Sequence, residues 1–134
     1  MMQLSQATGT DRYTIHSYSD GGICILHSTS TGVSPLPETL HQSLVLTPSR
    51  LIRNWPPQQF DALATAHFAI LDELQPEVLL LGCGPHQRFL PPGLQAHLAQ
   101  RGIPVELMNT GAACRTYNIL ASDGRNIAAA LLMI

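Results

Sequence analysis

The 134-residue sequence contains no lysine, and only 12% of its residues are charged. Its seven basic residues are all arginines, scattered along the chain, and the formal net charge is −2. A protein that binds the phosphate backbone of nucleic acids needs positive charge concentrated on one face. The composition therefore argues against nucleic acid as a partner.

Long apolar runs are also missing. The longest is Ile127–Ile134, far short of the roughly 20 residues that a membrane-spanning helix requires. The N-terminus shows neither a basic segment followed by an apolar stretch nor an arginine-rich amphipathic start, so we expect no secretory signal and no mitochondrial presequence. These patterns predict a soluble, cytoplasmic protein without a membrane span.

Cysteine is scarce, and the pattern of metal ligands is absent. Cys24, Cys83 and Cys114 are odd in number and widely spaced, which is typical of reduced thiols. The six histidines share no HxH or HxxxH spacing, so we expect no metal. The G-x-G at Gly82–Gly84 has Gln87 where a dinucleotide fingerprint has its third glycine. We therefore expect no cofactor.

What the chain does contain is enough apolar residues, 45%, for one packed domain. Residues 1–12 are polar and small, which predicts a flexible N-terminal segment before a single domain at 13–134. Asp20 and Gly21 lie between two strand-like runs and favour a tight hairpin turn. The expected elements here are hairpin strands at Tyr13–Tyr18 and Ile23–His27, a loop at Ser28–Thr39, and short strands at Ser43–Thr47 and Leu51–Asn54.

The remainder of the chain alternates helix and strand patterns. Apolar residues at three- and four-residue steps predict a helix of about four turns over Phe60–Leu74. The other expected elements are strands at Glu77–Leu81, Pro104–Met108 and Asn126–Ile134 and helices at Leu94–Gln100 and Thr110–Ser122. This order predicts one α/β domain with a mostly parallel sheet and helices packed against it, while the N-terminal hairpin either extends that sheet or forms a second small layer.

Two strand ends carry unusual residues, and in open α/β sheets ligands bind at the carboxyl ends of parallel strands. Gly82-Cys83-Gly84 follows one buried strand, and Asn109-Thr110 opens a helix whose free N–H groups favour an anion. The candidate ligand-binding residues are Gly82, Cys83, Gly84, Asn109, Thr110, Arg115, Tyr117 and Asn118. The competing interpretation is that the glycines only permit a tight turn and that Asn109 only caps the helix.

Three further side chains have two interpretations each. A helix N-terminus and Arg115 would lower the pKa of the Cys114 thiol, and Cys83 lies three residues from His86, so either thiol is a candidate nucleophile. The favoured alternative for both is a small buried side chain. Trp55 is favoured as a core residue over an exposed anchor for a partner.

No carboxylate lies in the two strand-end loops, so the sequence offers no obvious group for acid–base catalysis there.

Several segments resemble a known family. They are Val78–Gly84, Leu94–Gln95, Gln100–Glu106, Asn109–Asn118, Asp123–Arg125 and Ala128–Leu131. They are similar to the domain of unknown function shared by bacterial and archaeal proteins and by the mitochondrial respiratory complex I assembly factor 3. The most specific stretch is Ala112–Asn118. Trp55 also falls where that family tends to carry an aromatic residue.

The resemblance implies a three-layer α/β domain with a small additional β layer and no established enzyme activity. It also implies action through protein–protein contacts, as for the mitochondrial members. This chain departs from the family at two positions: Cys83 replaces the usual threonine, and Asn109 replaces an acid. If the family's crevice performs acid-dependent chemistry, Asn109 cannot take part in it as a base, which argues against an enzymatic function in this chain.

We therefore expect a non-enzymatic protein that acts through contacts with an unidentified protein partner, in the manner of an assembly factor for a membrane complex. The alternative is a small-molecule or anion-binding protein, enzymes included, with its crevice at Gly82–Gly84 and Asn109–Thr110. A ligand site predicts that the candidate side chains point into one open pocket. A scaffold role predicts that they pack and hydrogen-bond among themselves.

Overall fold

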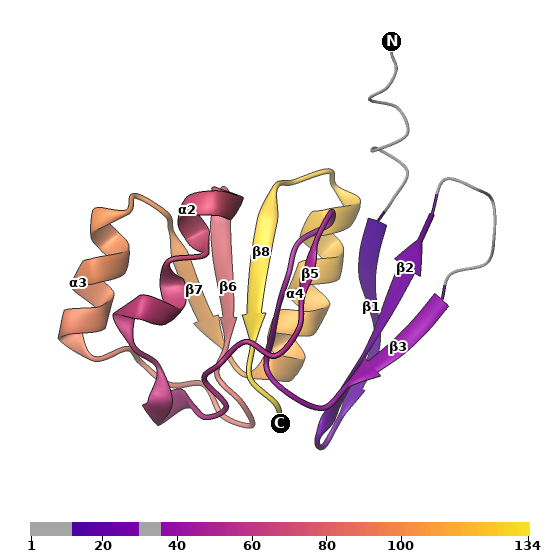
Figure 1. Cartoon of the computed structure of the whole chain (residues 1–134), viewed down its shortest axis with the longest axis horizontal. Helices are drawn as coiled ribbons and strands as arrows, with labels where there is room; N and C mark the ends of the chain where they lie inside the picture. Colours follow the sequence, from indigo (N-terminus) through magenta and orange to yellow (C-terminus); the bar gives the residue numbers. More distant parts are fainter. Residues whose placement is uncertain (1–11, 30–35) are drawn as a thin grey trace, which may run out of the picture.

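The computed structural model describes residues 12–29 and 36–134. The segment predicted to be flexible lies outside the described residues, except for Arg12, which is the first residue of strand β1 (Arg12–Ser19). Strands and helices with their order in space are shown in Figure 1.

The predicted N-terminal hairpin is confirmed. Strand β1 pairs antiparallel with β2 (Gly22–Ser28), and Gly21 takes the positive φ of 76° that the turn requires. The predicted loop is wrong at its end, because β3 (Leu36–Leu40) pairs with β2 and completes a three-stranded sheet. Pro37 lacks an N–H group, and an edge strand such as β3 tolerates this.

The second sheet has five strands in the order β5-β4-β8-β6-β7. They are β4 (Leu44–Leu46), β5 (Leu51–Ile52), β6 (Val78–Gly82), β7 (Val105–Met108) and β8 (Ile127–Leu131). Strand β6 runs parallel to β7 and β8, whereas β4 is antiparallel to both of its neighbours, β8 and β5. The α/β class is therefore confirmed, and the sheet is mixed, with β4 opposed to the other strands.

Two helices match their predicted positions. They are α3 (Pro92–Gln100) and α4 (Thr110–Ser122). Gly102, with a φ of 72°, follows α3 and permits the left-handed turn at its end. None of the helices in the described ranges is long and apolar enough to cross a membrane.

The predicted four-turn helix over Phe60–Leu74 is wrong. Two short 3₁₀ turns, η1 (Phe60–Ala62) and η2 (Thr65–Phe68), and a one-turn helix α2 (Leu71–Leu74) replace it. The Trp55 indole N–H donates to the His67 carbonyl at 3.0 Å, and the His67 ring accepts the Ala64 N–H at 3.0 Å. These contacts use groups that a continuous helix would bond internally, while 3₁₀ turns keep a similar apolar spacing.

Each face of the five-stranded sheet is covered. Helix α4 lies between this sheet and the three-stranded sheet, and α3, the 3₁₀ turns and α2 cover the opposite face (Figure 1). Successive side chains of β6 alternate, so that Leu80 packs towards α4 whereas Leu79 and Leu81 pack towards α3. Trp55 is buried in the α3-side core, as predicted.

Candidate functional site

The strand-end residues Gly82, Gly84 and Thr110 lie together at the carboxyl end of β6. The Thr110 hydroxyl accepts the Gly84 N–H at 2.9 Å and donates to the Leu132 carbonyl at 2.7 Å. The Thr110 N–H donates to the Gly84 carbonyl at 2.9 Å. Thr110 is completely buried, and its hydroxyl joins three chain segments.

Gly82 permits the close approach of α4 to β6. A Cβ atom at this position would lie 2.9 Å from the Thr110 hydroxyl oxygen and 3.1 Å from the Thr110 Cα atom. Gly84 has a φ of 97°, in the region that favours glycine. Both glycines are therefore explained by backbone geometry and packing.

Asn109 is the N-cap of α4, as one interpretation predicted. Its side-chain oxygen accepts the Ala112 N–H at 2.8 Å, which satisfies one of the free donors at the helix start. The capping bond fixes the side chain against its own helix.

The two candidate nucleophiles are buried thiols. Burial raises the pKa of the Cys83 thiol, whose sulfur lies 3.6 Å from the Leu81 carbonyl oxygen. Burial also raises the pKa of the Cys114 thiol to about 12, against the opposing effect of Arg115. The expected lowering of the Cys114 pKa is therefore wrong, because loss of water outweighs the neighbouring charge. Both thiols are neutral at physiological pH.

The remaining candidates, on α4, face β1 instead of the strand ends. The Asn118 side chain donates to the Ile15 carbonyl at 2.7 Å and accepts the Ile15 N–H at 2.9 Å. It thus bonds β1 as a neighbouring strand would, beside the register shift between Ile15 and Ser17. The Tyr117 hydroxyl donates to the Tyr13 carbonyl at 2.8 Å.

Arg115 is the exposed member of the candidate set. Its guanidinium donates to the hydroxyl of Tyr18. A small depression of about 120 Å³ lies beside it between β1 and α4, and His16 and Asn118 also line this depression. The eight predicted residues therefore form two groups, one at the strand ends and one between α4 and β1.

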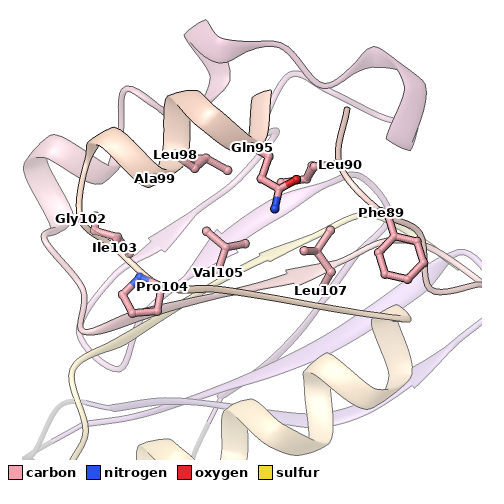
Figure 2. A pocket seen from close by; sticks show the side chains of 10 residues that line it. All are labelled: Phe89, Leu90, Gln95, Leu98, Ala99, Gly102, Ile103, Pro104, Val105 and Leu107. Atoms are coloured by element: carbon pink, nitrogen blue, oxygen red, sulfur yellow. The ribbon is translucent and has the colours of Figure 1, made fainter. Parts of the chain in front are cut away.

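The sequence interpretation missed a larger groove of about 390 Å³ between α3 and β7 (Figure 2). Its lining residues are Phe89, Leu90, Gln95, Leu98, Ala99, Gly102, Ile103, Pro104, Val105 and Leu107. Val105 and Leu107 project from β7 towards α3 in Figure 2, and Phe89, which is 82% exposed, lies at one end. The available signal was the pair Phe89-Leu90, two large apolar residues between the predicted strand at Glu77–Leu81 and the predicted helix at Leu94–Gln100.

Five ion pairs lie at or near the surface of the part of the chain that the structure describes. Arg50, Arg53, Arg88, Arg101 and Arg125 each pair with a carboxylate. Within the described residues, no group of three or more histidine, cysteine, aspartate or glutamate side chains is placed to hold a metal ion.

Residues 15–132 match the model of a family described as "Protein of unknown function (DUF498/DUF598)". A Danio rerio protein named NADH dehydrogenase (ubiquinone) 1 alpha subcomplex assembly factor 3 is 34% identical over 132 residues, which covers 98% of this chain and 69% of that protein. An uncharacterised Rhodobacter capsulatus protein is 47% identical over 58 residues, which covers 43% of this chain and 47% of that protein. The chain thus spans only part of the length of these relatives.

A crystal structure of a Bordetella parapertussis protein has the same fold, with a TM-score of 0.74 and 30% identity. The similarity covers 93% of this chain and 98% of that one. Residues 15–132, which the family model matches, include strands of both the five-stranded and the three-stranded sheet. The chain belongs to the DUF498/DUF598 family of proteins of unknown function.

Proposed function

We propose that this chain is a non-enzymatic assembly factor that acts through protein–protein contacts on a respiratory NADH:ubiquinone oxidoreductase. A role in assembly of this enzyme is supported by the name of the Danio rerio relative, which describes it as an assembly factor for that enzyme. The observation that carries the non-enzymatic part is the internal use of the candidate polar groups. The hydroxyl of Thr110 and the amide of Asn118 are bonded to the backbone of this chain.

This bonding favours a scaffold over a catalytic centre. A nucleophile or general base needs a free lone pair and a pKa near the working pH. The thiols of Cys83 and Cys114 are buried with raised pKa values, and Asn109 is occupied as a helix cap. We therefore expect the fold to act as a scaffold whose exposed surface binds a partner protein.

A gene deletion tests the proposal. In the organism that encodes the chain, we expect deletion to lower the amount of assembled NADH:ubiquinone oxidoreductase on a native gel and the NADH oxidation rate of its membranes. A plasmid copy of the gene should restore both. Unchanged assembly and activity in the deletion strain would contradict the proposal.

The second candidate function is binding of a small anion, with Arg115 as the main ligand. It is favoured by one observation, the depression of about 120 Å³ that Arg115 shares with His16. At the strand ends, Gly82–Gly84 and Asn109–Thr110 offer a small molecule fewer free groups because of their internal bonds. Phosphate and nucleotides should then raise the melting temperature of the wild type but not of Arg115→Ala.

We also propose a cytoplasmic location. The three cysteines are free, and Cys83 and Cys114 are buried, which fits a reducing compartment. Fractionation of cells that express a tagged chain would test this location.

A further inference from the structure

Strand β7 forms one end of the five-stranded sheet, and none of the described strands pairs with its outer edge. The Leu79 N–H donates to the Pro104 carbonyl at 2.9 Å, and the Cys83 N–H donates to the Met108 carbonyl at 2.8 Å. Backbone groups alternate in direction along a strand. The N–H and C=O groups of Val105 and Leu107 therefore point away from β6, towards the open edge of the sheet, where an added strand could bond them.

The same two residues also line the groove. The side chains of Val105 and Leu107 form its floor, opposite Leu98 of α3 and beside the exposed ring of Phe89 (Figure 2). Backbone groups that no described residue bonds and an apolar groove therefore lie side by side. This combination suits an extended peptide, because the backbone supplies hydrogen bonds and alternate side chains enter the groove.

Glu106 determines what kind of peptide fits. Its side chain is exposed and forms no ion pair with the described residues, unlike Glu38, Glu73 and Glu77. If two copies of β7 paired antiparallel with Val105 bonded to Leu107, the two Glu106 side chains would lie directly opposite each other. Like charges at that position are destabilising. A second copy is therefore disfavoured, and a basic side chain is favoured.

We propose that β7 accepts an extended segment of a partner protein as a sixth strand. A lysine or arginine of that segment lies opposite Glu106, and the apolar residues on either side of it enter the groove between α3 and β7. This inference rests on the proposed function, since it identifies the surface through which the protein contacts are made.

Selection from a random 12-residue peptide library displayed on phage tests the pattern. On the folded full chain, we expect enrichment of peptides with a basic residue between two apolar residues. Glu106→Arg should shift the enriched central residue to aspartate or glutamate. Asp123→Arg makes the same charge change at an exposed position beyond the end of α4 and should leave the basic preference intact.

Three outcomes would overturn the inference. One is the absence of any enriched pattern, and another is a basic preference that persists in Glu106→Arg. The third is a wild-type dimer that buries β7. Circular dichroism of Glu106→Arg, expected to match the wild type because Glu106 is exposed, separates lost binding from lost folding.

Amide hydrogen exchange measured by NMR then locates an enriched synthetic peptide. Exchange of the Val105 and Leu107 N–H groups should slow at least tenfold when the peptide is bound at saturation. Slowing confined to β1 and α4 would place the peptide elsewhere and reject the inference.

The deletion strain separates failure of this inference from failure of the proposed function. If deletion lowers enzyme assembly and a Glu106→Arg gene restores it fully, the inference that β7 binds the partner is rejected while the assembly function stands. If deletion has no effect on assembly, the assembly function fails, and the peptide selection decides the β7 surface alone.

Discussion

At the scale of single residues, the candidate site consists of groups that have already found partners. Thr110 bonds Gly84 and Leu132 with one hydroxyl, and Gly82 leaves room for it. A buried hydroxyl with two partners contributes to stability, and it has little left for a ligand. Polar residues at a strand end can thus serve the joint between a helix and a sheet.

Gly82→Ala should destabilise the protein by about 1–3 kcal/mol, because the new methyl group would collide with the Thr110 hydroxyl and backbone. Urea unfolding followed by circular dichroism measures the change. Gly93→Ala in α3 is the matched control, since a Cβ there meets nothing within 4 Å. The control should be neutral or stabilising by less than about 1 kcal/mol. Equal stability of Gly82→Ala and wild type would contradict the packing argument.

The buried thiol of Cys114 should make the free energy of unfolding depend on pH. Its pKa is about 12 in the folded protein against an ordinary value of 9.0. The unfolded chain therefore loses this proton first, so the stabilisation is complete below pH 9 and is lost as pH rises from 9 towards 12. Urea unfolding in reducing buffer at pH 7.5 and pH 10 should show lower stability at pH 10. A Cys114→Ala protein with an undiminished pH difference would refute this assignment.

At the scale of elements, α4 holds the two sheets together. One side packs on β6 and β8, and the other side binds β1 through Tyr117 and Asn118. Gly111 lets the Tyr18 ring approach the helix, because a Cβ there would lie 2.9 Å from the ring. The attachment of the three-stranded sheet therefore depends on a few specific contacts along this helix.

Asn118→Ala should lower the free energy of unfolding by about 2–3 kcal/mol, because two hydrogen bonds to Ile15 are lost and its backbone groups are left without those partners. Hydrogen exchange of β1 amides should accelerate more than exchange in β6. Ile119→Ala changes the adjacent residue of the same helix, whose side chain is 62% exposed, and should cost less than about 0.5 kcal/mol. Uniform acceleration of both sheets would argue against a local role for Asn118.

At the scale of the whole molecule, the two sheets leave exposed edges, which proteins protect from unwanted pairing. Strand β3 carries Pro37, together with Glu38 in an ion pair with Arg53. Strand β7 carries Glu106 between two apolar residues. A charged residue on an edge strand limits self-association. Replacing Glu106 by an apolar residue should therefore increase self-association.

Glu106→Val should cause concentration-dependent dimerisation through β7, because the charge that opposes pairing of two copies is removed. Sedimentation velocity at several concentrations measures the change. Asp123→Val removes the same charge beyond α4 and should sediment as the wild type does. Sedimentation of Glu106→Val identical to wild type would contradict a protective role for Glu106.

Local signals explain which parts of the fold could be predicted from the sequence. Asn109 caps α4, and Gly124, with a φ of 76°, follows its end, so both bounds of that helix were predictable. The 3₁₀ turns that replace the helix predicted over Phe60–Leu74 bond Trp55 through the His67 carbonyl, and no local pattern contains this contact. The role of Asn118 was equally hidden, since Ile15 lies 103 positions away in the chain.

The position of β8 has a consequence for the order in which the chain folds as it is synthesised. This strand is the last of the described elements, yet it pairs with β4 on one side and β6 on the other. Until β8 leaves the ribosome, the β4–β5 hairpin and the β6–β7 unit have no shared strand. Completion of the central sheet must therefore follow translation of residue 131. Until then, the apolar residues of both halves lack the contacts that β8 provides.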